Sequence, residues 1–186
     1  MSTIRKLKGT ALSPDQLKNY YKEQTGESLK VIMLNQVSPN DTIDSIFSQG
    51  CLVLFIPVMS SYNGHFVSLF RTKQGIYFLD SYANTPKGLF ETIEDLGKVH
   101  LKTHLFEIIS KSGENVYNNT ILYQSKTEDI ADCGRFAVIN CILFTKFKNA
   151  NKSYDLNTFN NKLIEFMKEN NLEDYDDAIV HLTSDL

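Results

Sequence analysis

The sequence has no tryptophan, three cysteines and four prolines, and its basic N-terminus lacks the apolar segment of a secretory signal. Three cysteines without such a signal predict free thiols in a reducing compartment rather than a disulfide framework. The longest apolar run, 51–59, is too short for a helix that crosses a membrane. A formal net charge of −3 without a basic block disfavours a dedicated nucleic-acid binder. These absences predict an intracellular protein that makes no membrane contact.

The length of the chain predicts one domain over residues 1–186, large enough for a hydrophobic core of its own. No repeat, linker or low-complexity segment interrupts the sequence. Asparagine, lysine, isoleucine, tyrosine and phenylalanine are plentiful while tryptophan is absent, which is the bias that AT-rich coding produces. That bias hints at a virus or a protist as the source.

Hydrophobic periodicity and turn residues divide the chain into the strands and helices of an α+β domain. The predicted form is a central mixed sheet of about five strands flanked by helices. The predicted strands are 51–59, 65–71, 76–81, 105–109 and 116–123. The predicted helices are 14–24, with Ser13 as its cap and Gly26 as its stop, 41–48, 86–96, 133–147, 156–169 and 173–182.

The stretch 123–138 has the strongest chemical signal in the sequence, because a polar loop leads into a helix that begins at or next to a cysteine. The helix is apolar almost all round, which predicts that it is the central one. Cys133 in its first turn faces unpaired N–H groups and the positive end of the helix dipole, and both stabilise a thiolate. Gly134 leaves space for a reacting carbonyl, and Gln124 offers an N–H donor that can complete an oxyanion hole beside the Cys133 N–H.

A nucleophilic thiol needs a base, and the base needs a group that orients it. The second and third predicted strands supply His65 and Asp80, and a tight turn at 72–75 joins these strands. A four-residue loop pairs Arg71 with Ile76. In that register His65 and Asp80 are diagonal neighbours on one face of the sheet, within reach of each other. A loop with an odd number of residues would place the two side chains on opposite faces.

The order of these motifs resembles the adenain and Ulp1 superfamily of cysteine proteases. Gly-His-aromatic is followed by a strand ending in Leu-Asp-Ser-Tyr, then by Gln, and finally by Asp-Cys-Gly before an apolar helix. The resemblance implies that His65 is the base, Asp80 the orienting acid, Gln124 the oxyanion donor and Cys133 the nucleophile. It also implies a papain-like arrangement, in which the nucleophile lies at the N-terminus of the central helix.

The chain departs from the family pattern at two places within the resembling region, 51–147. The residue after the histidine is usually tryptophan in the family and is Phe66 here. The interval from Gln124 to Cys133 is a few residues longer than usual.

The activity that the resemblance implies is a thiol endopeptidase, and the compact chain and its AT-rich composition favour the viral maturation type within that family. Its substrate would be an extended peptide segment of a capsid or other virion precursor, cut next to small residues such as glycine. The enzyme would act as a monomer in the virion or the host-cell cytoplasm, without a metal or an organic cofactor. The sequence does not indicate whether a peptide or a nucleic acid activates it. Three alternatives remain open: a Ulp1-type isopeptidase for a ubiquitin-like modifier, an effector acetyltransferase, and a binding protein that kept the fold without the reaction.

Other polar and sulfur side chains have structural interpretations. Asp132 is predicted to cap the cysteine helix. Cys51 and Cys141 lie in apolar segments and are predicted core residues. His100, His104 and Glu107 are close enough in sequence to suggest metal ligands, but no further ligand completes a set, so no metal site is predicted.

Overall fold

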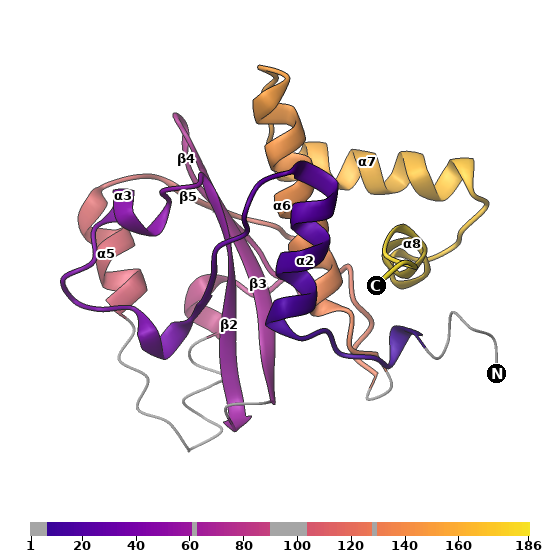
Figure 1. Cartoon of the computed structure of the whole chain (residues 1–186), viewed down its shortest axis with the longest axis horizontal. Helices are drawn as coiled ribbons and strands as arrows, with labels where there is room; N and C mark the ends of the chain where they lie inside the picture. Colours follow the sequence, from indigo (N-terminus) through magenta and orange to yellow (C-terminus); the bar gives the residue numbers. More distant parts are fainter. Residues whose placement is uncertain (1–6, 61–62, 90–103, 128–129) are drawn as a thin grey trace.

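The structure is a computed structural model that describes residues 7–60, 63–89, 104–127 and 130–186. Its fold is α+β, with a five-stranded mixed sheet and helices on both faces (Figure 1). The strands, in their order across the sheet, are β1 (Val31–Met33), β2 (Cys51–Ser60), β3 (Asn63–Thr72), β4 (Gly75–Leu79) and β5 (Val116–Asn118). The three central strands are antiparallel, whereas β1 and β5 run parallel to the strands beside them.

The helices that the structure describes are α2 (Pro14–Thr25), α3 (Ile43–Ile46), α5 (His104–Ser112), α6 (Cys133–Asn149), α7 (Leu156–Glu169) and α8 (Tyr175–Leu182). A 3-10 turn, η1 (Leu34–Gln36), follows β1. Figure 1 shows α3 and α5 on one side of the sheet and α2 and α6 on the other, with α7 and α8 farther from the sheet. No helix in these described ranges has both the length and the apolar composition required to cross a membrane.

The helix that begins at Cys133 is the central helix, as the sequence predicts. Phe136 and Val138 are fully buried, and they join Phe55 and Phe70 of the sheet in one hydrophobic core. Full burial of one such side chain stabilises a fold by about 2 kcal/mol, so this interface fixes the direction of α6. The second core lies between the other face of the sheet and the helices α3 and α5.

The turn between β3 and β4 sets the register that the sequence analysis predicts. Arg71 pairs with Ile76 as predicted, but Thr72 also pairs with Gly75, so the turn consists of two residues, Lys73 and Gln74, and not of the predicted four. Gly75 has φ 144°, and a Cβ there would lie 2.4 Å from the Asn115 carbonyl oxygen, so only glycine fits this position.

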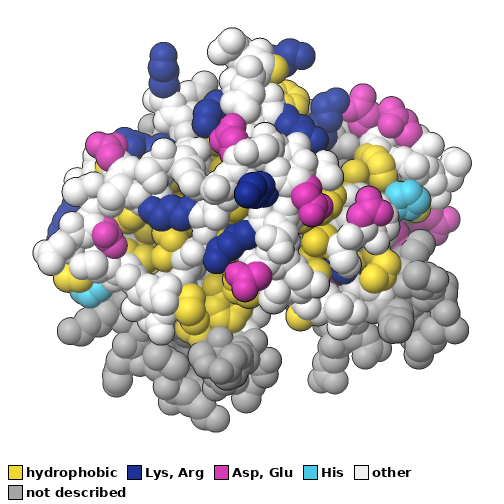
Figure 2. Space-filling view, viewed as in Figure 1, with side chains coloured by type: hydrophobic (Ala, Val, Ile, Leu, Met, Phe, Trp, Pro, Cys, Tyr) yellow, Lys and Arg dark blue, Asp and Glu magenta, His cyan; other side chains and the backbone are white. Residues whose placement is uncertain are grey.

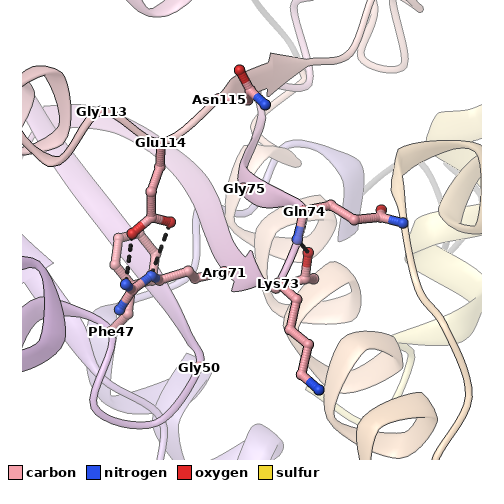
Figure 3. A pocket seen from close by; sticks show the side chains of 10 residues that line it. Phe47, Gly50, Arg71, Lys73, Gln74, Gly75, Gly113, Glu114 and Asn115 are labelled. Carbon is pink, nitrogen blue, oxygen red and sulfur yellow. Dashed lines mark hydrogen bonds and ion pairs between the residues drawn. The ribbon is translucent and has the colours of Figure 1, made fainter.

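A polar cavity of about 750 Å³ lies beside this turn (Figure 3). Arg71 faces Glu114 there and forms a two-point ion pair, with Nη2–Oε1 at 2.6 Å and Nε–Oε2 at 3.0 Å. Arg71 Nη1 also lies 2.6 Å from Asp44 Oδ1. The guanidinium therefore ties β3 to α3 and to the segment before β5, and its charge is already paired.

Two predicted strands are wrong in whole or in part. Residues 105–109 belong to helix α5, whose buried side chains Leu105 and Ile109 are four residues apart, as on one face of a helix. A short run of β-branched and aromatic residues had favoured a strand there. The predicted strand 116–123 ends at Asn118, because the side chain of Asn119 takes over the pairing with Asp80.

The other predicted elements differ from the structure mainly at their ends. The first helix is confirmed with its Ser13 capping box and with Gly26 at φ 75°. The helix at 156–169 is confirmed, and the last helix begins two residues later than predicted, after an Asp174 cap. The helix at 41–48 shortens to α3, and only 86–89 of the predicted helix 86–96 lies within the described residues, where it is helical. Strand β1 was not predicted.

Surface charge is mixed on the face shown in Figure 2. Lysine and arginine side chains alternate with aspartate and glutamate side chains there, without a continuous basic area.

Candidate active site

Cys133 is the first residue of α6, and the packing of that helix against the sheet places the thiol next to β3. Gly134 is buried against the sheet: a Cβ there would lie 3.3 Å from Phe66 Cδ2 and 3.5 Å from a methyl group of Leu17. The glycine therefore allows the first turn of α6 to approach β3 and α2 closely. This packing accounts for Gly134 more directly than the predicted space for a substrate carbonyl.

His65 and Asp80 meet as the sequence analysis predicts. His65 Nε2 lies 2.8 Å from Asp80 Oδ1, and both side chains are buried, with 8 % of His65 and none of Asp80 exposed. Two further donors hold the Asp80 carboxylate: the Tyr82 N–H donates to Oδ1 at 2.8 Å, and Asn84 Nδ2 donates to Oδ2 at 3.0 Å. The carboxylate is thus fixed in one orientation toward the imidazole.

The environment of His65 favours the imidazolium. Burial of the ring lowers its pKa, but hydrogen bonding to Asp80, interaction with the Cys133 sulfur and the negative charge of both outweigh burial and raise the pKa to about 10. Because Nε2 is occupied by Asp80, Nδ1 is the nitrogen left to face the sulfur. Tyr82 stacks on the ring, with centroids 5.1 Å apart and planes at 25°, and limits its rotation.

Gln124 lies in the same site, at the end of the segment that follows β5. Its backbone N–H donates to the Ser81 carbonyl at 3.0 Å. Its side-chain Oε1 accepts from Ser81 Oγ at 2.9 Å, and its Nε2 donates to the Ile130 carbonyl at 3.1 Å. The longer interval between Gln124 and Cys133 therefore does not remove the amide from the site.

A cavity of about 760 Å³ is lined by three of the four predicted residues, His65, Gln124 and Cys133, while Asp80 is buried behind His65. Its walls come from the segment before α2, from β1 to β3, from the turn after β4 and from the loop before α6. Among the described residues, the lining contains no aspartate, glutamate, lysine or arginine; it consists of Ala11, Leu12, Ser13, Pro14, Met33, Phe55, Gly64, His65, Phe66, Tyr82, Gln124, Ile130, Ala131 and Cys133. Sequence reasoning missed the wall at 11–14 and Met33, because both belong to segments far from the catalytic motifs.

Asp132 does not cap α6, so that prediction is wrong. Its backbone, at φ −92° and ψ 0°, is not extended, and its side chain makes no capping hydrogen bond. Instead the buried carboxylate pairs with the buried Arg135, with Oδ1 3.3 Å from Nε. Burial raises the pKa of Asp132 to about 7, against the opposing charge of Arg135 and with the support of the negative charge of Asp176.

The buried Arg135 joins the two ends of the chain to the first turn of α6. Its Nη1 donates to Thr183 Oγ1 at 2.7 Å and to the Thr183 carbonyl at 3.1 Å, and its Nη2 donates to the Leu7 carbonyl at 3.4 Å. The loop before the cysteine has similar anchors. The Ala131 N–H donates to the Lys8 carbonyl at 2.8 Å, and the Ser125 N–H donates to Asp176 Oδ2 at 3.0 Å.

The other two cysteines, His104 and His181 lie outside this site, and His100 lies outside the described residues. Cys51 and Cys141 are free, buried core residues, as predicted. His104 Nδ1 lies 3.7 Å from Glu107 at the start of α5. Within the part of the chain that the structure describes, no group of three or more histidine, cysteine, aspartate or glutamate side chains could hold a metal ion.

Comparison with known proteins gives a distant structural similarity. No family model matches the chain, and no curated protein matches it in sequence. Its fold is similar to that of the C-terminal Ulp1 protease domain in complex with Smt3, the yeast orthologue of SUMO. That match has 17 % identity and a TM-score of 0.39, and it covers 95 % of this chain and 75 % of that one. A structure of the SUMO protease Ulp1 with its catalytic cysteine oxidised to a sulfinic acid is similar at 15 % identity and a TM-score of 0.41, over 98 % and 84 % of the two chains. Similarity at this level leaves the functional argument to the geometry of the site.

Proposed function

We propose that this chain is a cysteine endopeptidase that uses Cys133 as its nucleophile. The observation that carries the proposal is the buried His65 ring, which is bonded to Asp80 on one side and interacts with the Cys133 sulfur on the other. The ring and the sulfur both line one cavity. Thiol acyl transfer requires a nucleophile, a base next to it and an acid that orients the base.

In the proposed reaction, the Cys133 thiolate attacks the peptide carbonyl carbon and forms a C–S bond. The Cys133 N–H and the Gln124 amide stabilise the oxyanion that develops. His65 gives its Nδ1 proton to the leaving amine as the C–N bond breaks, which leaves a thioester on Cys133. A water molecule then attacks the thioester, His65 takes the proton of the water, and the released thiolate restores the starting pair.

The substrate that we propose is an extended protein segment that carries no charged side chain near the cut. Apart from the His65–Cys133 pair, no charged side chain of the described residues lines the cavity, and this supports the proposal because a buried charge without a partner is costly. A capsid or virion precursor cut next to glycine fits such a cavity. The only support for a viral origin of this chain is the composition of its sequence. A Ulp1-type isopeptidase, which cuts after the terminal glycines of a folded modifier, is the alternative.

The test is covalent labelling with a peptide electrophile that ends in Gly-Gly, followed by mass-resolved mapping of the adduct. We expect one adduct on Cys133 in the wild type and strongly slowed labelling in His65→Ala. Cys51 and Cys141 serve as internal controls, since each is at most 1 % exposed. A His104→Ala variant, altered at the start of α5, should label like the wild type. Equally slow labelling of all three cysteines in every variant would refute the proposal.

A second comparison separates the two kinds of substrate. Gly-Gly conjugates of folded ubiquitin-like modifiers and unfolded capsid-type peptides with internal glycines are each incubated with the wild type. Cleavage of the peptides alone supports the maturation protease, and cleavage of the conjugates alone supports the isopeptidase.

A further inference from the structure

Ser81 occupies a central position in the site, although the proposed chemistry gives it no role. It lies between Asp80, which holds the imidazole of His65, and Tyr82, which stacks on the same ring. The side chain of Ser81 is 1 % exposed, so its hydroxyl depends on protein partners for hydrogen bonds. The cavity lining does not include Ser81, and the serine therefore cannot act on a substrate directly.

The contacts of Ser81 converge on Gln124. The Ser81 carbonyl accepts from the backbone N–H groups of Tyr123, at 2.9 Å, and Gln124, at 3.0 Å. Ser81 Oγ lies 2.9 Å from Gln124 Oε1. One residue thus holds both the main chain and the side chain of the predicted oxyanion donor.

The orientation of the Gln124 amide follows from its second partner. A carbonyl oxygen only accepts, so the atom 3.1 Å from the Ile130 oxygen must be Nε2. Oε1 then faces Ser81, and the Ser81 hydroxyl must be the donor in that bond. If the amide were reversed, its oxygen would lie against the Ile130 oxygen, and two acceptors at that distance repel each other.

We propose that Ser81 is a positioning residue that holds the Gln124 amide with its nitrogen toward the catalytic cavity. This inference rests on the proposed function. Nε2 carries two N–H groups, and the Ile130 carbonyl occupies one of them. The other is the group that meets the oxyanion in the cavity. Without the Ser81 hydroxyl the amide retains only the Ile130 bond, and it rotates among orientations that do not present this N–H.

The test is a double-mutant cycle with Ser81→Ala, Gln124→Ala and the double variant. The substrate is acetylglycine p-nitrophenyl ester, a small activated ester that reports acyl transfer to the cysteine without a need for recognition by remote subsites. We expect Ser81→Ala to lower kcat about tenfold with KM within about twofold, which is the kinetic equivalent of one hydrogen bond. In the Gln124→Ala background the same change should lower kcat less than about twofold, because the serine acts only through the glutamine.

Ser68→Ala is the matched control. Ser68 is also a fully buried serine, and its Oγ accepts from Asn140 Nδ2 at 2.8 Å in the interface between β3 and α6, away from Gln124. This variant loses the same kind of hydrogen bond, and its kcat should equal that of the wild type. A kcat of Ser81→Ala equal to that of the wild type, or an equal loss in both backgrounds of the cycle, overturns the inference.

Side-chain amide NMR tests the inference without any need for turnover. The ¹⁵N–¹H resonances of the Gln124 amide should shift and exchange faster with solvent in Ser81→Ala but not in Ser68→Ala. Unchanged Gln124 resonances in Ser81→Ala overturn the inference. A wild type that does not turn over the ester contradicts the proposed function instead, and the NMR comparison still decides whether Ser81 orients the amide.

Discussion

Replacement of Asp80 by asparagine should separate the charge of the acid from its shape. Asp80 Oδ1 accepts from His65 Nε2 and from the Tyr82 N–H, while Oδ2 accepts from Asn84. An asparagine can keep its oxygen on the first two donors and place its NH₂ group toward Asn84. Asn84 is partly exposed, so its amide can turn and offer an oxygen. Asp80→Asn therefore keeps the contacts of His65 and removes the negative charge.

The expected consequence is a lower pKa for His65. In the wild type, burial lowers this pKa, but Asp80 and Cys133 together raise it to about 10. A hydrogen bond to a charged group exceeds a neutral one by roughly 1.5 kcal/mol, and that difference corresponds to about one pKa unit. The pKa of His65 should thus fall by about one unit or more in Asp80→Asn.

The raised pKa of His65 also makes the free energy of unfolding depend on pH. The folded pKa of His65 lies above the value of about 6.5 for an unfolded histidine. The protonated ring therefore contributes to the free energy of unfolding in full below pH of about 6.5, and this contribution is lost as the pH rises through about 10. In Asp80→Asn the loss should be complete at a lower pH.

The measurement is a pH titration of the His65 ring nitrogens by NMR, together with the alkaline limb of kcat/KM for acetylglycine p-nitrophenyl ester. Both midpoints should move to lower pH in Asp80→Asn. Asp44→Asn is the matched control, because Asp44 pairs with Arg71 at the opposite end of β3. A His65 midpoint that is the same in the wild type and in Asp80→Asn would refute the reasoning.

Three further predictions concern the support of the site. Asp132→Ala should lower the free energy of unfolding by about 3 kcal/mol in urea denaturation, because it leaves the buried Arg135 without its counter-charge. The double variant Asp132→Ala/Arg135→Met should recover most of that loss. A double variant as unstable as Asp132→Ala would contradict the counter-charge role. Tyr82→Phe should keep kcat within about twofold, whereas Tyr82→Ala should lower it about tenfold, because the ring and not the hydroxyl restrains His65; equal activity of the two variants would count against the stacking role. Gly134→Ala should lower the unfolding free energy by about 1 kcal/mol, because the added methyl group presses on a ring 3.3 Å away; a thermal melt at the wild-type temperature would disprove it.

The sequence predicted the parts of the site that depend on local rules. The register of β3 and β4 follows from the length of one turn, so the meeting of His65 and Asp80 could be derived by counting residues. The place of Cys133 at the start of the central helix followed from the change from a polar loop to an apolar helix. Such features depend only on residues that are close in the sequence, so contacts between distant segments do not alter them.

The missed features depend on contacts between distant segments. The strand predicted at 105–109 is a helix because α5 covers one face of the sheet and needs a continuous buried stripe. Asp132 was expected to cap α6, but the tertiary structure gives it Arg135, which also binds Thr183 and Leu7. Nothing within the cysteine motif indicates that the ends of the chain meet there.

The end of β4 shows how one short segment organises the whole site. Strand pairing stops at Leu79, and the Asn119 side chain then replaces a strand by accepting from the Asp80 N–H at 2.9 Å and donating to the Asp80 carbonyl at 2.7 Å. Asp80 also begins a turn, because its carbonyl accepts from the Ala83 N–H at 2.9 Å, and the next two residues contact Gln124 and His65. Because Asp80 and Tyr82 contact His65 and Ser81 holds Gln124, a displacement of this segment would disturb the imidazole and the amide together. The geometry of the candidate site therefore depends on Asn119 as well as on the cysteine helix.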